Sequence, residues 1–363
     1  MPSPKHHRSA GREVCIVAAL LFVACSPIRR ECRGTETKPS VEVSIDALND
    51  VKREIVAAQV ILLHDDSVRR DLKLTEVQKV DIDRTAAEID YPIWYVREAQ
   101  DAETKVKCAR AFDHLEQRLA TSLTPTQSAR FDGILLQTHG WPAIFAPRFV
   151  DALKLTAEQQ SRIREHLAAA KADSTTAAVA KQIEAVLSGE QRTKLTTLIG
   201  PRFDGMRLRK RYCRAPALIG VDEWINSKPL DWKQLEGKVV VVHFWAFGCI
   251  NCVRNLPHYQ AWHEKFAGEG VLVVGLHTPE TASERIAEAV RAKTAEYKMA
   301  YPVAIDGAAK NWNAWATRWW PSVYLVDKRG YIRYWWAGEL NWQGTEGEAV
   351  MRKRIAELLA EKD

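Results

Sequence analysis

The sequence predicts two domains of different fold class, an all-α helical repeat domain followed by an α/β domain. Residues 44–205 contain few glycines and almost no strand signals, while phrases typical of helix starts recur along them. From residue 216 onward, runs of β-branched residues alternate with segments whose apolar residues follow helical spacing. The length of 363 residues leaves room for two hydrophobic cores. We therefore expect a helical domain at 44–205 and an α/β domain at 216–363.

Residues 1–25 have the features of a secretion signal. The basic residues that open it are Lys5, Arg8 and Arg12. They precede the apolar segment Val14–Ala24, whose eleven residues are too few to span a bilayer. Its end, Phe22-Val23-Ala24-Cys25, resembles a bacterial lipobox with phenylalanine in place of the usual leucine. Two outcomes stay open, lipidation of Cys25 as a membrane anchor and ordinary cleavage nearby. Both predict an exported, periplasmic protein in an oxidising compartment, with residues 26–43 as a linker.

Four phrases in the helical region carry the arrangement of a capping box, in which a hydroxyl accepts from the N3 amide and a glutamine reaches back to the N-cap amide. They are Leu74–Gln78, Leu123–Gln127, Leu155–Gln159 and Leu187–Gln191. The hydroxyl residues Thr124, Thr156 and Ser188 are 32 residues apart, which predicts one helix, a connection and a second short helix per unit. The phrases resemble the L-T-x-x-Q repeat of periplasmic Spy- and CpxP-like proteins. Two roles stay open, a scaffold that spaces the next domain from its anchor and a surface for unfolded or partner proteins.

Neither a nucleic-acid partner nor a metal site is indicated by the sequence. A net charge of +6 is modest for this length, and no nucleic-acid-binding motif is present. Basic residues concentrate at 202–214, which predicts a solvated linker at 206–215 between the domains. His64-Asp65-Asp66 offers no third partner for a metal ion and is expected to be a solvated helix end. We predict no metal site.

Two cysteines lie where a buried strand of the α/β domain leads into a helix. The apolar run after Gly237 predicts the strand, and Val253–Phe266 has helical spacing. At a helix N-terminus the unpaired N–H groups and the macrodipole lower the pKa of a thiol, so Cys249 is the expected thiolate. Cys252, separated from Cys249 by two residues, is close enough to form a disulfide with it and to resolve a mixed disulfide. The sequence has no second C-x-x-C, which argues against a zinc site.

Further elements follow in a definite order. Val271–Leu276 predicts a buried strand, a helical stretch lies near Ser283–Tyr297, and Tyr301–Asp306 follows it. Trp319–Arg333 predicts two strands joined by a glycine-containing turn, with a proline at the entry. Strand, helix, strand and then a hairpin with a proline at its entry is the order of elements in thioredoxin.

The motifs of this domain resemble those of the extracytoplasmic thioredoxin-like proteins of the TlpA and DipZ type. They are Phe244-Trp245-x-x-Gly248-Cys249-Ile250-Asn251-Cys252-x-Arg254-x-Leu256-Pro257-His258, Gly275–Glu280, Tyr301-Pro302-Val303 and Trp320-Pro321-Ser322. The resemblance runs from about Pro216 to the C-terminus and implies a thioredoxin fold. It implies that Cys249 and Cys252 are the redox pair, with no cofactor beyond their redox-active disulfide. It also implies that Pro321 forms a cis peptide facing the pair and aligns an extended substrate segment.

Three more residues are candidates for roles around the pair. Trp245 is placed to pack beside it, and Trp320 belongs to an aromatic cluster that can bind an extended apolar peptide. His243 stands six residues before the first cysteine, where thioredoxins carry a buried aspartate that helps to deprotonate the resolving thiol. A neutral imidazole can do the same near pH 7. The alternative is a core histidine bonded to a carbonyl.

The remaining cysteines are Cys32, Cys108 and Cys213, an odd number, so at least one is a free thiol or pairs between chains. A Cys108–Cys213 bridge is one option. The expected function is a thiol:disulfide oxidoreductase whose partners are protein thiols and disulfides and an upstream electron donor or acceptor. The alternative is an envelope-stress or chaperone-type binding protein whose thioredoxin domain is a docking platform. A thiol peroxidase is disfavoured because those enzymes use a lone peroxidatic cysteine.

Overall fold

The computed structural model describes residues 45–95, 97, 101–173 and 176–362. The predicted signal segment, the lipidation candidate Cys25, the linker 26–43 and Cys32 lie outside these residues. The chain forms two compact units, one made of Ala129–Gly205 and the other of residues 45–128 together with residues 206–362. Among the described helices, none has both the length and the apolar character needed to cross a bilayer.

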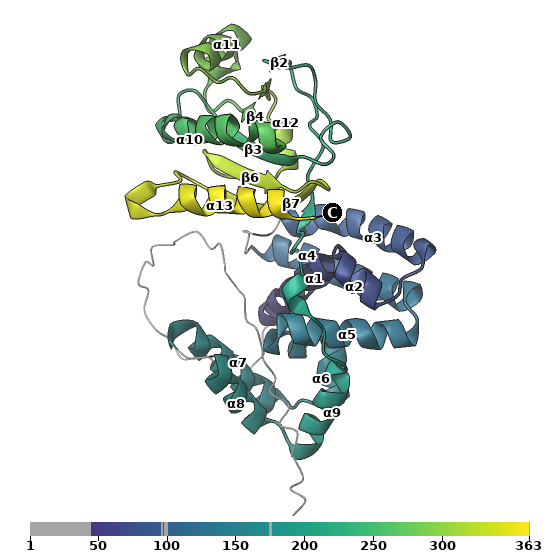
Figure 1. Ribbon diagram of the computed structural model, residues 1–363. Coiled ribbons are helices and arrows are strands. Elements are labelled where there is room, and N and C mark those ends of the chain that lie inside the picture. The colour runs from purple at the N-terminus through teal and green to yellow at the C-terminus, as the bar shows by residue number, and fades with distance from the viewer. Residues whose placement is uncertain (1–44, 96, 98–100, 174–175, 363) are drawn as a thin grey trace, which may run out of the picture. The chain divides into compact units, whose positions relative to one another are not determined.

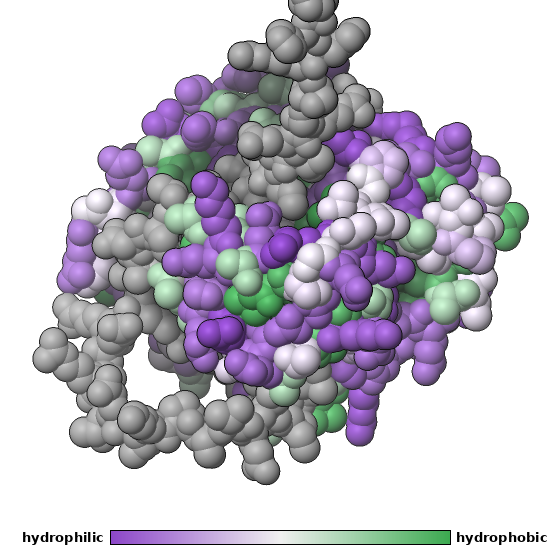
Figure 2. Space-filling view, turned by 90° about the horizontal axis from the view of Figure 1, so that it is seen from below, coloured by the Kyte–Doolittle hydropathy of each residue, from purple (hydrophilic) through white to green (hydrophobic). Residues whose placement is uncertain are grey.

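The N-terminal region is helical, as predicted (Figure 1). Its α-helices are α1 (Ile45–Leu63), α2 (Asp66–Asp71), α3 (Glu76–Tyr95), α4 (Ala102–Ser122), α5 (Pro125–His139), α6 (Pro147–Leu153), α7 (Ala157–Asp173), α8 (Thr176–Val186) and α9 (Gly189–Ile199). Two helices lie in each predicted 32-residue interval, since α5 and the short α6 lie between Thr124 and Thr156, and α7 and α8 lie between Thr156 and Ser188. The face drawn in Figure 2 is mostly hydrophilic, with smaller hydrophobic areas between the polar side chains.

All four predicted capping boxes are present. In each, the glutamine N–H donates to the hydroxyl oxygen and the glutamine Oε1 accepts from the N–H of the capping residue. The glutamines also pair with one another. Gln78 Nε2 donates to Gln127 Oε1 at 2.7 Å, and Gln159 Nε2 donates to Gln191 Oε1 at 2.8 Å. Each compact unit therefore contains one partly buried junction where two helix starts share a glutamine pair.

The C-terminal region contains a mixed seven-stranded sheet in the order β1-β7-β6-β3-β4-β5-β2. Its strands are β1 (Cys213–Arg214), β2 (Glu223–Ile225), β3 (Val239–Trp245), β4 (Val271–His277), β5 (Val303–Ile305), β6 (Ser322–Val326) and β7 (Tyr331–Ala337). Its α-helices are α10 (Ile250–Phe266), α11 (Ala287–Glu296), α12 (Lys310–Ala314) and α13 (Gly347–Ala360). Strands β3, β4 and β5 are parallel, while β6 and β7 run antiparallel to their neighbours. The predicted fold class, a helical region followed by an α/β thioredoxin-like fold, is confirmed.

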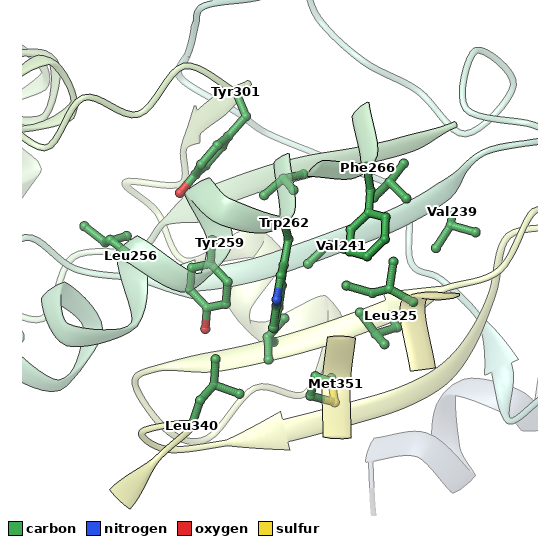
Figure 3. Packing of buried hydrophobic residues seen from close by; sticks show 14 of the residues in the cluster. Val239, Val241, Leu256, Tyr259, Trp262, Phe266, Tyr301, Leu325, Leu340 and Met351 are labelled. Carbon is green, nitrogen blue, oxygen red and sulfur yellow. The ribbon is translucent and has the colours of Figure 1, made fainter. Parts of the chain in front are cut away.

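The two faces of the sheet carry separate hydrophobic cores, because side chains alternate along each strand. On one face, Val239 and Val241 of β3 pack with residues of α10 and α13 (Figure 3). On the other face, Val240, Val242 and Phe244 pack with Trp94, which comes from α3 of the helical region. A helix from the N-terminal region therefore completes the second core.

The segment expected to be a solvated linker is partly buried, so that expectation is wrong. Arg211 is only 1% exposed, and its guanidinium binds Asp327 at 3.0 Å and Asp66 at 3.2 Å. Directly after it, β1 pairs with β7. Because a guanidinium is buried only where carboxylates compensate its charge, the basic cluster here serves packing within the fold.

The His64-Asp65-Asp66 segment is also not a solvated helix end. His64 and Asp65 are both buried. His64 Nε2 lies 2.7 Å from Asp90 Oδ1, and Asp65 caps α2 by accepting from the N–H of Ser67 at 2.8 Å. Within the described residues, no group of three or more potential ligands is arranged to hold a metal ion.

Candidate active site

Cys249 is the N-cap residue of α10, at the position predicted for it. Its Sγ accepts from the N–H of Cys252 at 3.2 Å, and the two cysteines form a disulfide. Cys249 is half-buried, whereas Cys252 is buried in the core beneath the helix. In the reduced protein the same N–H and the helix dipole stabilise a thiolate at Cys249. The arrangement thus gives one sulfur that a substrate can reach and one that is shielded.

Strand β3 fixes this geometry because it is buried along its whole length between β4 and β6. Its last residue, Trp245, is paired with His277 at the end of β4. The three residues after it lead into α10, and the N–H of Cys249 donates to the carbonyl of Ala246 at 3.3 Å. The cysteine pair therefore lies at the carboxyl end of the central strand.

The Trp320–Pro321 peptide is cis, as predicted. The next residue, Ser322, pairs with Phe244 near the carboxyl end of β3. Pro321 therefore lies at the same end of the central strands as the cysteines. Trp320 Nε1 donates to the carbonyl of Thr278 at 3.2 Å, and the ring stacks on Trp312 at a centroid distance of 3.8 Å.

Of the other tryptophans close to Trp320 in sequence, Trp319 lies at the surface and Trp315 in the core. Trp319 is 62% exposed, whereas Trp315 is fully buried in the second core. Trp245 is also fully buried and packs in the same cluster as Cys252, behind the redox pair. The substrate contacts assigned to Trp245, Trp320 and Pro321 stay predictions.

His243 is completely buried, and burial lowers its pKa to about 3. Its ring stacks on Tyr259 of α10 at 4.2 Å, and Nε2 lies 3.1 Å from the hydroxyl of Tyr301. The hydrogen-bond partner is thus a hydroxyl and not the carbonyl considered above. The imidazole is neutral at pH 7 and lies on the face of β3 that packs against α10, so its role as proton acceptor stays a prediction.

Glu284 is a buried residue at the site to which the sequence analysis gave no role. It lies in the 3-10 helix η4 (Ala282–Arg285) and forms a capping box with Thr281. Its Oε1 accepts from the N–H of Gly248 at 2.6 Å, directly before the first cysteine. The spacing Thr281-x-x-Glu284 is a capping-box signal that predicts the local bond to Thr281, but the bond to Gly248 joins segments 36 residues apart.

His277 is a second buried group at the site without an assigned role. Its ring contacts Trp245 edge-on at 5.0 Å and stacks on Phe247 at 5.5 Å. Burial lowers the pKa of His277 to about 4, although the charge of Glu284 acts in the opposite direction. Within the described chain neither ring nitrogen has a hydrogen-bond partner.

Cys108 and Cys213 are both buried, and no disulfide joins them. Burial raises the pKa of the Cys213 thiol, so this thiol stays protonated. The bridge considered in the sequence is therefore absent, and the cysteines with redox geometry in the described chain are Cys249 and Cys252.

The fold and the dithiol define the C-terminal part as a thioredoxin-like domain. Comparison with known proteins agrees, because residues 215–335 match the model of the AhpC/TSA family. The domain is similar to those of thiol-disulfide oxidoreductases.

Three relatives illustrate the similarity. Protein DipZ of Mycobacterium bovis is 40% identical over 135 residues, which are 36% of this chain and 19% of DipZ. Thiol-disulfide oxidoreductase YkuV of Bacillus subtilis is 24% identical over 148 residues, 41% of this chain and 95% of YkuV. A solved thiol-disulfide isomerase from Corynebacterium glutamicum is 29% identical, with 41% of this chain and 98% of that chain covered and a TM-score of 0.35. The chain thus spans about a fifth of the length of DipZ.

Proposed function

We propose that this protein is a thiol-disulfide oxidoreductase that exchanges disulfides with protein substrates through Cys249 and Cys252. The observation that carries the proposal is the asymmetry of the pair, since Cys249 caps α10 at the surface and Cys252 lies buried behind it. Attack by the accessible sulfur and resolution by the shielded one is the order that this asymmetry favours. The similarity to named thiol-disulfide oxidoreductases supports the same chemistry.

The reaction proceeds by two exchanges. The Cys249 thiolate attacks one sulfur of a substrate disulfide, which forms a mixed disulfide and releases the other substrate sulfur as a thiolate. The Cys252 thiolate then attacks Cys249 Sγ, so the bond to the substrate breaks and the second substrate thiolate leaves. Two electrons have passed to the substrate, and the Cys249–Cys252 disulfide has formed. The same steps in reverse oxidise a substrate dithiol.

The substrate is an extended segment of a protein with apolar side chains. Ile250, between the cysteines, is 60% exposed. Trp319, directly before the cis Trp320–Pro321 peptide, is 62% exposed. Exposed apolar side chains of this size mark binding surfaces. We assign Pro321 and Trp320 to contact with such a segment, because Ser322 pairs with Phe244 near the end of the strand that leads to Cys249.

The compartment is extracytoplasmic and oxidising, with an upstream electron donor or acceptor that resets the pair. Support comes from the basic and apolar N-terminal segment, which has the pattern of a secretion signal. Lipidation of Cys25 would tether the protein to the membrane and is part of the proposal.

Replacement of Cys252 by Ala tests the mechanism. In this variant the mixed disulfide cannot be resolved, so substrates accumulate on Cys249 and appear on non-reducing gels. Cys249→Ser is the matched control and should trap nothing. A wild-type chain without a reversible two-electron transition, and a Cys252→Ala variant that traps no partner, would favour the alternative of a binding protein with structural cysteines.

A further inference from the structure

One buried carboxylate holds the loop that leads into the redox pair. Glu284 is 1% exposed and accepts three backbone hydrogen bonds. Oε1 binds the N–H of Gly248 at 2.6 Å, while Oε2 binds the N–H of Glu280 at 2.6 Å and of Thr281 at 2.8 Å. Because both oxygens serve only as acceptors, the hydrogen bonds fit the ionised side chain.

The opposite side of this contact favours glycine. A Cβ atom on residue 248 would lie 2.8 Å from Glu284 Oε1, closer than real contacts of this kind allow. Glycine at 248 therefore lets the carboxylate approach the backbone directly before Cys249. Gly248 and Glu284 act as a matched pair across the site.

The charge of Glu284 has no cationic partner among the ion pairs of the described residues. His277 lies nearby but is neutral at pH 7, since burial lowers its pKa to about 4. On α10, the exposed Arg254 donates to Asn251 Oδ1 and forms an ion pair with Glu339 at 3.4 Å. Backbone N–H groups alone compensate the charge of Glu284 directly, one residue away from Cys249.

We infer that Glu284 is a positioning residue that fixes the Gly248–Cys249 segment and, through its charge, disfavours the Cys249 thiolate, so that the pair is poised to donate electrons. This inference rests on the proposed function. A like charge nearby opposes formation of an anion. Only the reduced form contains the thiolate, and a less stable reduced form is the stronger reductant.

Glu284→Gln in the full chain tests the inference by removing the charge while keeping the side-chain shape. We expect the thiol-disulfide equilibrium with a dithiothreitol or glutathione buffer, at about pH 8.5 where thiols ionise, to shift at least fivefold toward the reduced protein. Fivefold corresponds to about 20 mV for this two-electron couple. Cys249 should also react with iodoacetamide at lower pH than in the wild type.

Glu288→Gln is the matched control, because Glu288 lies on the exposed side of α11 and its loss removes an equal charge. It should change the equilibrium by less than 1.5-fold. Gly248→Ala tests the contact from the other side, since the added Cβ displaces the carboxylate. In that background the effect of Glu284→Gln should fall below twofold, because two residues that act together are not additive.

The outcomes separate this inference from the proposed function. A folded Glu284→Gln protein with unchanged equilibrium and alkylation profile overturns the inference and leaves the oxidoreductase proposal in place. A wild-type protein without any redox transition overturns the oxidoreductase proposal instead. If Glu284→Gln does not fold, Gly248→Ala alone decides, with at least a twofold shift in the same direction expected and no shift overturning the inference.

Discussion

At the scale of the residue, the site combines one accessible sulfur with buried ionisable groups. Cys249 and Cys252 were predictable because C-x-x-C, a preceding apolar run and the onset of helical spacing are all local in sequence. The bond from Gly248 to Glu284 was not, because it depends on how a loop after β4 folds back over the end of β3. His243 was predicted as a candidate, but its partners Tyr259 and Tyr301 come from distant segments.

Replacing His243 by Phe should remove an acid sensitivity of the fold. The pKa of His243 is lowered to about 3 in the folded protein, whereas an unfolded histidine titrates near 6.5. Below about pH 6.5 only the unfolded state gains this proton, so the wild type loses about 1.4 kcal/mol of stability per pH unit. The variant lacks this loss and keeps the ring stacked on Tyr259. In urea unfolding between pH 7.5 and 5, the free energy of unfolding of the variant should rise relative to that of the wild type as the pH falls.

The same variant tests the proton-transfer role. If His243 accepts the proton of the resolving thiol, resolution of a preformed mixed disulfide should slow in His243→Phe by about a hundredfold or more, since a hundredfold is the low end of general-base effects. Parallel pH curves of stability would contradict the titration. An unchanged resolution rate would leave His243 as a core residue.

At the scale of the element, the glutamine pairs tie helix starts together. The four capping boxes were predictable from local spacing. The pairing of Gln78 with Gln127 and of Gln159 with Gln191 was not, because spacing in sequence does not reveal which helix starts meet in space. Strand β1 was missed for the same reason, since two residues in a basic segment become a strand only by pairing with β7.

Gln159→Ala should destabilise the unit formed by Ala129–Gly205 by about 2 kcal/mol, roughly half from the lost cap and half from the unpaired partner Gln191. The side chain bonds Thr156 N, the carbonyl of Val186 and Gln191. Gln160→Ala is the control at the next position and should cost less than about 1 kcal/mol, since its amide donates to the carbonyl of Leu155 and accepts from Arg164 but does not join a second helix start. Equal midpoints in urea for the two variants would argue against the glutamine pair as a stabilising junction.

At the scale of the whole molecule, the helical region and the sheet share a core in the unit formed by residues 45–128 and 206–362. Trp94 of α3 is 3% exposed and contacts Tyr324 and Trp335 edge-on, and its Nε1 donates to the carbonyl of Trp315 at 2.9 Å. The sequence indicated two fold classes correctly. It did not indicate that they meet, because an apolar residue on a helix does not reveal which neighbour it packs against.

Trp94→Ala should lower the stability of this unit by about 3 to 5 kcal/mol, the usual cost of deleting a buried aromatic ring. In thermal unfolding, the midpoint temperature of the transition that includes the redox domain should fall. Tyr91→Phe on the same helix removes only the hydroxyl that donates to Asn313 at 3.2 Å and should cost about 1 kcal/mol or less. A Trp94→Ala protein as stable as Tyr91→Phe would mean that the sheet does not depend on α3.

The burial of Cys213 has a consequence for biosynthesis. In the oxidising compartment proposed above, a nascent chain would expose this thiol until β1 docks at the edge of the sheet. During that interval Cys213 could form a mispaired disulfide, and Cys249, 36 residues further along the chain, is the nearest cysteine in sequence. Docking of a two-residue strand thus ends the period in which misfolding by disulfide scrambling competes with maturation.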